Sequence, residues 1–72
     1  MRRKQHLRYV VTGPGLEEVS YADVGPALSR TITAASQSVE EVTYYARDSI
    51  LGVIVGHSER DALGIVRTRR VA

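Results

Sequence analysis

The sequence predicts a small α+β domain, in which one helix packs on an antiparallel sheet of three to four strands. The expected order is strand, helix, strand, strand, strand. Three observations predict it: apolar residues alternate in 6–12, recur at three- and four-residue steps in 24–36, and form an almost wholly apolar run with several β-branched residues in 50–57. At 72 residues, the chain should form a single domain, 1–72, with a basic N-terminal arm at 1–5.

The first strand is expected over residues 6–12, where every second side chain from Leu7 to Val11 would share one face. Residues 13–15, Gly-Pro-Gly, should end this strand, because glycine and proline are the strongest turn formers. The segment 16–20 has two interpretations. It is either a loop or a short strand that pairs back on the first.

A helix is expected over residues 24–36. Asp23 is a suitable N-cap, and Pro26 would lie in the first turn, where its missing N–H group has no helical partner to lose. The apolar residues of this segment would form one buried stripe along the helix: Val24, Ala27, Leu28, Ile32 and Ala35.

Residues 38–47 carry conflicting signals. Ser38 and Glu41 have the spacing of a capping box, which would begin a second helix and make a helix-turn-helix conceivable. The alternation that includes Tyr44 and the β-branched residues favours a strand instead, and we adopt the strand. In a strand, Tyr44 and Tyr45 point to opposite faces, so one ring should be buried and the other exposed. An exposed tyrosine beside arginines is used to stack unpaired bases, and is also common at protein interfaces.

The last third predicts two more strands. The run ILGVIVGH at 50–57 is typical of a central strand that is buried on both faces or packed at an oligomer interface. Residues 58–61 are polar and have the length of a hairpin loop, and 62–70 would return as the final strand. The residues expected in the core are Val11, Leu28, Ile32, Val53, Val55 and Ile65.

Charge is distributed unevenly along the chain. The two ends carry +7, whereas the middle carries −5, because all eight acidic residues lie between positions 17 and 61. Such segregation indicates a polyanionic partner, although basic ends can also serve only to keep a chain in solution. If the first and last strands were antiparallel neighbours, the basic ends would merge into one patch, which is costly unless an anion faces it. The candidate nucleic-acid-binding residues are Arg2, Arg3, Lys4, Arg8, Arg67, Arg69 and Arg70.

No pattern of catalytic, metal-ligating or cofactor-binding residues emerges. His6 and His57 have no neighbouring ligands at metal-binding spacing. His57, Ser58 and Glu59 are adjacent, but successive residues of a hairpin point in different directions, whereas a triad is defined by geometry. We therefore expect neither an enzyme nor a bound metal or cofactor.

The remaining composition suggests where the protein works and with what. The chain has no cysteine and no apolar run of membrane-spanning length, so we expect a cytoplasmic protein. Its core must form without Phe or Trp, a shortage that self-association would relieve. The first functional hypothesis is a nucleic-acid-associated accessory or regulatory protein. The alternative is a protein-interaction module or homo-oligomeric regulator, of phage or bacterial origin, that binds no nucleic acid.

Overall fold

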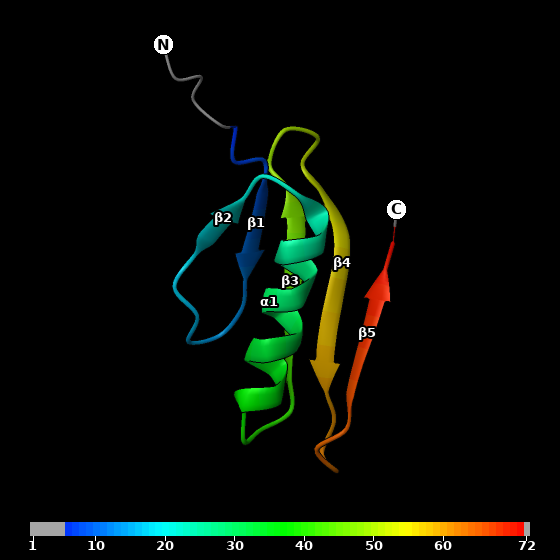
Figure 1. Cartoon of the computed structure of the whole chain (residues 1–72). Coiled ribbons are helices and arrows are strands. Elements are labelled where there is room, and N and C mark those ends of the chain that lie inside the picture. Colours follow the sequence, from blue (N-terminus) through cyan, green and yellow to red (C-terminus); the bar gives the residue numbers. More distant parts are fainter. Residues whose placement is uncertain (1–5, 72) are drawn as a thin grey trace.

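The computed structural model describes residues 6–71, and shows one helix lying across one face of a five-stranded antiparallel sheet (Figure 1). The strands lie in the order β2-β1-β3-β4-β5. The predicted α+β class is confirmed, but the chain order is β-β-α-β-β-β, with one strand more than expected. The elements are β1 (Tyr9–Thr12), β2 (Val19–Tyr21), α1 (Val24–Gln37), β3 (Val42–Asp48), β4 (Val53–Arg60) and β5 (Val66–Arg70).

The additional strand settles the interpretation of the segment after the first turn. β2 is a short edge strand that pairs antiparallel with β1, with Val11 opposite Val19. The Gly-Pro-Gly segment does turn the chain, as predicted. The N–H of Leu16 donates to the carbonyl oxygen of Gly13 at 3.2 Å, and Gly15 has φ +70°, a conformation that favours glycine.

The helix α1 begins at Val24, as predicted, and ends one residue later than expected, at Gln37. Asp23 occupies the N-cap position, but its side chain makes no capping hydrogen bond. The predicted helix phase is wrong in part, because Ile32 is 41% exposed. The face that meets the sheet is built from small residues: Ala27, Thr31, Ala34 and Ala35.

The core is thin because small side chains bring the helix close to the sheet. One cluster joins Val11, Ala27, Ala46 and Val55, and a second joins Ala34, Ala35 and Tyr44. Gly56 in β4 is part of this close approach. A Cβ atom at that position would overlap the side chain of Leu28 and lie 3.0 Å from the carbonyl oxygen of Arg69. Of the six residues expected in the core, Val11 and Val55 are buried and Leu28 is partly buried, whereas Ile32, Val53 and Ile65 are exposed.

Strand β3 confirms the strand interpretation of residues 38–47, from Val42 onward. Ser38 forms no capping box. Its hydroxyl group instead bonds locally to the backbone of Glu40, as the acceptor of the N–H at 3.2 Å and as a donor to the carbonyl at 3.0 Å. Tyr44 is buried and Tyr45 is exposed, which confirms that the two rings point to opposite faces of the sheet.

The boundaries of the last two strands were predicted wrongly. Residues 50–52, expected in a buried strand, form the turn before β4. Residues 58–60, expected in the hairpin loop, belong to β4 itself, and 62–64 form a turn instead of beginning β5. The apolar run thus lies partly in an exposed turn, while part of the polar segment is paired on both sides within the sheet.

Both turns are built by an aspartate and a glycine. The carboxylate of Asp48 accepts the N–H groups of Ile50 and Leu51, and Gly52 follows with φ +70°. Asp61 accepts the N–H groups of Leu63 at 2.9 Å and Ile65 at 3.0 Å, and Gly64 has φ +84°. The hydrogen bond from Ile65 is the main reason that the pKa of Asp61 is lowered. These carboxylates accept hydrogen bonds from the backbone of the turns. The apolar residues within the two turns therefore lie at the surface.

A β-bulge in β4 changes which side chains face the helix. Ala46 pairs with Gly56, whereas the next residue of β3, Arg47, pairs with Ile54, so Val55 is the extra residue. Val55 packs in the core beside Ala46, and Gly56 also faces the helix. The regular alternation therefore breaks at this point. Ile54 and His57 both lie on the face of the sheet away from the helix.

Candidate nucleic-acid interface

The face of the sheet opposite α1, called here the open face, is covered by no other element of the described residues (Figure 1). Side chains alternate along a strand and paired residues share a face, so the register assigns each strand residue to one side. The strand residues of the open face are Val10, Thr12, Ser20, Thr43, Tyr45, Arg47, Ile54, His57, Glu59, Arg67 and Arg69.

The open face is basic. Arg47, Arg67 and Arg69 lie on it and are exposed, and Glu59 is the only acid among its strand residues. Glu59 pairs with Arg67 in the register of β4 and β5. Three arginines against one glutamate leave the open face with a positive field, which would attract a polyanion.

One row of side chains crosses the open face at the middle of the sheet. Thr12, Tyr45, His57 and Arg69 are successive cross-strand partners on β1, β3, β4 and β5. The rings of Tyr45 and His57 have centroids 6.0 Å apart and are tilted by 53°. Tyr45 is 37% exposed, and His57 is half-buried. This row therefore places an aromatic ring, an imidazole and a guanidinium side by side.

The structure separates the basic residues that the sequence analysis grouped. Arg67 and Arg69 lie on the open face, whereas Arg70 pairs with Gly56 and so projects to the helix side of the sheet. The starts of β1 and the ends of β5 lie at the same end of the sheet, but β3 and β4 separate the two strands. Three strand spacings correspond to about 14 Å. The condition under which the basic ends would merge, that the first and last strands are neighbours, is therefore not met. Arg2, Arg3 and Lys4 lie outside the described residues.

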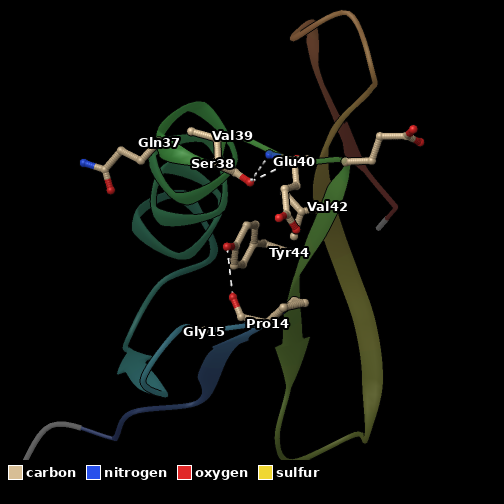
Figure 2. Close-up of a pocket in the computed structure, with 9 residues that line it drawn as sticks. Pro14, Gly15, Gln37, Ser38, Val39, Glu40, Val42 and Tyr44 are labelled. Atoms are coloured by element: carbon tan, nitrogen blue, oxygen red, sulfur yellow. Dashed lines mark hydrogen bonds between the residues drawn. The ribbon is translucent and has the colours of Figure 1, made fainter.

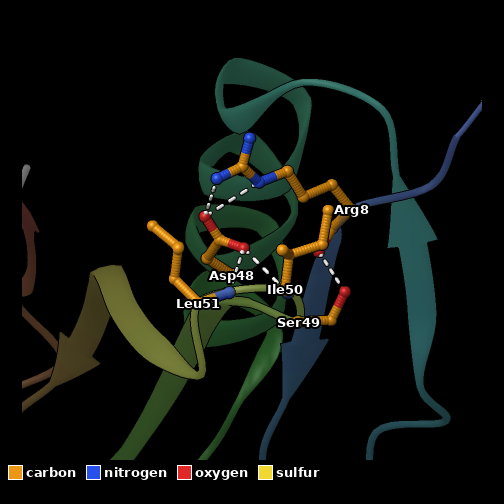
Figure 3. A network of polar contacts seen from close by, with 5 residues as sticks. All are labelled: Arg8, Asp48, Ser49, Ile50 and Leu51. Atoms are coloured by element: carbon orange, nitrogen blue, oxygen red, sulfur yellow. Dashed lines mark hydrogen bonds and ion pairs between the residues drawn. The ribbon is translucent and has the colours of Figure 1, made fainter.

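Arg8 is engaged in a structural ion pair at the end of the sheet. Its guanidinium donates two bonds to one carboxylate oxygen of Asp48, from Nε at 2.9 Å and from the terminal nitrogen at 2.7 Å (Figure 3). The other oxygen of Asp48 accepts the N–H groups of Ile50 and Leu51. This network joins the start of β1 to the turn after β3. The positive charge of Arg8 is thereby paired with the negative charge of Asp48.

The Arg8–Asp48 contact also shifts both ionisation equilibria. The hydrogen bond from Arg8 is the largest reason that the pKa of Asp48 falls to about 2 from its ordinary value of 3.8. The same hydrogen bond raises the pKa of Arg8 above its ordinary value. Asp48 is almost fully buried, at 2% exposure, so its negative charge is held in place by these partners.

Arg47 is a basic residue of the open face that the sequence analysis did not select. It lies in the acidic middle of the chain, so the charge segregation argument passed over it. The signal was nevertheless present in the alternation of β3, since Arg47 stands two residues after Tyr45 and must share its face.

A chain of hydroxyl groups on the opposite side anchors the edge strand that carries Arg67 and Arg69. Thr31 of α1 donates to the carbonyl oxygen of Leu28 at 2.6 Å, and its hydroxyl oxygen lies 2.8 Å from that of Ser58 in β4. Ser58 in turn lies 2.7 Å from the hydroxyl oxygen of Thr68 in β5. Thr31 and Ser58 are fully buried. The strand bearing the two arginines is thus held to the helix through β4.

A separate depression of about 520 Å³ lies at the C-terminal end of the helix (Figure 2). Its lining includes Glu40 and Glu41, whose carboxylates would repel a polyanion. The hydroxyl group of Tyr44 points toward the loop 13–15 and donates to the carbonyl oxygen of Pro14 at 3.0 Å (Figure 2). This hydroxyl is therefore used to fix the loop. The depression offers no basic side chain to a phosphate.

Comparison with known proteins adds no assignment. No family model matches the chain, and it has no significant match among curated proteins or among solved structures. Over residues 6–71, no group of three or more histidine, cysteine or acidic residues is placed to hold a metal ion. In the same part of the chain, no helix has the length and apolar character needed to cross a membrane.

Proposed function

We propose that this protein is a small nucleic-acid-associated accessory or regulatory module, which contacts phosphates through the arginines of the open face. One observation carries the proposal: Arg67 and Arg69 of β5 share this uncovered face with Arg47 of β3, and Glu59 alone opposes them among its strand residues. These arginines span strands β3 to β5 of the sheet, over which an extended polyanion could lie.

Contacts of this kind have a defined physical consequence. Each phosphate that an arginine neutralises releases condensed counterions, so the logarithm of the binding constant falls linearly with the logarithm of the salt concentration. Each contacted phosphate adds about 0.9 to the size of this slope on duplex DNA and about 0.7 on single strands. Phosphate contacts position a protein without identifying the bases. The binding that these arginines provide should therefore depend strongly on salt and weakly on sequence.

A titration of fluorescently labelled oligonucleotides at several salt concentrations, followed by anisotropy, tests the proposal. Arg69→Gln should weaken binding and reduce the salt slope, and Arg67→Gln/Arg69→Gln should do so further. Arg30→Gln is the matched control, because it removes the same charge from α1, which lies on the opposite side of the sheet. This control should change binding little.

The result that overturns the proposal is equally clear. If the wild-type protein binds neither duplex nor single-stranded oligonucleotides at low salt, where the attraction is strongest, the arginines do not serve nucleic-acid binding. If Arg69→Gln and Arg30→Gln weaken binding equally, binding depends on the net charge of the protein and not on the position of its arginines. The open face would then not be the binding site.

A second candidate function, self-association or protein binding, is favoured by a different observation. The turn between β3 and β4 and the first residue of β4 expose three large apolar side chains close together in the chain: Ile50, Leu51 and Val53. Their exposed apolar surface lies at the end of the sheet, next to the Arg8–Asp48 ion pair. A second copy of this chain could cover it, which would also compensate for the thin core.

A further inference from the structure

The row Tyr45–His57–Arg69 has a feature that phosphate binding does not explain, namely the exposed aromatic ring of Tyr45. Resting on the proposed function, we infer that the open face is a site for single-stranded nucleic acid, with an unpaired base stacked on Tyr45. Tyr45 is the exposed member of the tyrosine pair, whereas Tyr44 faces the core. The arginines would hold the phosphates on either side of the stacked base.

The placement of charge around the ring fits such a ligand. Arg47 stands two residues along β3 from Tyr45, on the same face. Arg69 lies in a different direction, across the strands and beyond His57, in the same cross-strand row. Guanidinium groups therefore stand near the aromatic ring both along β3 and across the sheet. Base stacking on an aromatic ring flanked by basic side chains is how sheets hold single strands.

The ring geometry leaves the face of Tyr45 available. The tilt of 53° between Tyr45 and His57, with centroids 6.0 Å apart, is not the parallel arrangement in which one ring would cover the other. A base in a duplex already has its two faces stacked on its neighbours, so only an unpaired base can lie flat on an exposed ring. The ligand inferred here is thus a single strand rather than a duplex.

His57 supports the same inference through an unsatisfied atom. Its Nδ1 is buried and has no hydrogen-bond partner, an arrangement that costs free energy and that an apolar residue would avoid. Nδ1 itself is too buried to reach a ligand, so a contact would come from the exposed part of this half-buried ring. The imidazole edge beside Tyr45 would contact the base or sugar next to the one stacked on the tyrosine.

The test compares oligothymidine, oligouridine and a DNA hairpin duplex with the same number of phosphates, at one salt concentration, by anisotropy. Both single strands should bind more tightly than the duplex, and their ratio separates DNA from RNA as the preferred source. Tyr45→Leu should lower single-strand affinity by about 5- to 100-fold, the usual effect of losing one base–aromatic stack. Tyr45→Phe should retain most of the affinity, and duplex binding should be the same in all three proteins.

A measurement on the wild-type protein keeps the test decisive if Tyr45→Leu folds poorly. The ring-proton NMR signals of Tyr45 should shift on titration with oligothymidine, and should not shift with inorganic polyphosphate, which supplies charge without bases. Equal affinity for duplex and single strand, with unshifted Tyr45 signals, would overturn the inference while leaving the arginine-based function standing. Absence of all binding would instead remove the proposed function itself.

Discussion

The hydroxyl oxygen of Ser58 lies 2.8 Å from that of Thr31, and this contact joins the centre of the sheet to the helix inside a core that is otherwise built of small apolar residues. Because Ser58 also contacts Thr68 at 2.7 Å, a single buried hydroxyl serves both α1 and the edge strand β5. Ser58 therefore contributes both to the stability of the fold and to the position of β5, the strand that carries Arg67 and Arg69.

Ser58→Ala should lower the free energy of unfolding by about 1–3 kcal/mol, because it leaves the buried hydroxyl of Thr31 without one of its partners. Urea denaturation followed by circular dichroism measures this loss. Thr33→Ala is the matched control, since Thr33 is exposed and its hydroxyl bonds only within the helix, to the carbonyl oxygen of Ser29. An equal loss in both variants would mean that the buried contact contributes no more than the exposed hydrogen bond of Thr33 within the helix.

The Arg8–Asp48 pair should make stability depend on acid. The pKa of Asp48 is about 2 in the folded state, below its ordinary value of 3.8, so the folded state binds this proton less readily than the unfolded chain does. The stabilisation is fully present above about pH 4 and is lost as the pH falls toward 2. Denaturation curves between pH 5 and 2 should show this loss in the wild type.

Asp48→Asn should be less stable than the wild type at neutral pH, and should lose much less of its stability between pH 4 and 2. Asp23→Asn is the control, because Asp23 is exposed and makes no capping bond, so its variant should follow the wild-type curve. In Arg8→Gln, the pKa of Asp48 should rise toward its ordinary value, as followed by NMR of its carboxyl carbon. An unchanged pKa in that variant would contradict the assigned cause.

Gly56→Ala should destabilise the fold by about 1–3 kcal/mol, the usual range for overpacking, because the added methyl group overlaps the side chain of Leu28. Gly25→Ala offers a matched control in α1, where nothing lies within 4 Å of the added Cβ. That substitution should be neutral or slightly stabilising, since alanine favours helix. Thermal melts of the two variants check the difference, and equal melting temperatures would mean that the helix can move away from β4 without cost.

Self-association, if it occurs through the turn between β3 and β4, should be sensitive to Leu51, which is 65% exposed. We expect the wild type to sediment as a dimer or larger species at high micromolar concentration, and Leu51→Lys to sediment as a monomer. Leu63→Lys introduces the same charge in the turn at the opposite end of the sheet, and should leave the assembly intact. A wild-type monomer at that concentration would exclude the self-association candidate.

Several elements could be predicted because their signals are local. The helix start at Val24, the turn at 13–15 and the opposed rings of Tyr44 and Tyr45 follow from spacing and from turn residues, and the structure agrees with each. Local pattern also located β3. What these features share is that neighbours in the sequence determine them, without reference to the rest of the sheet.

The burial and the turn boundaries were predicted wrongly where tertiary contacts determine them. Ile32 is more apolar than Thr31, yet Thr31 faces the sheet because Ser58 supplies a partner for its hydroxyl group. The apolar residues after Asp48 are exposed because the carboxylate organises a turn there. An Asp followed by Gly within three or four residues was the available signal for both turns, at 48–52 and 61–64.

The candidate site was predicted only in its components. Arg67, Arg69 and an exposed tyrosine were all identified, but their common face depends on the strand order and on the registers of β3 with β4 and of β4 with β5. Arg8 could not be separated from the other basic residues, because its partner Asp48 is 40 positions away in the chain. Charge segregation along a sequence does not reveal which charges are already paired in the fold.

The extra residue in β4 has a consequence for how this chain can change through descent. Before Val55 the outward residue is Ile54, and after it the outward residue is His57, so the strand joins two alternation frames that differ by one position. Loss of Val55 would cost one buried side chain but would leave every other residue of β4 on its present side. Because Val55 and Gly56 both face inward, one residue can be gained or lost at this point of β4 over evolutionary time without exchanging the inward and outward surfaces of the sheet.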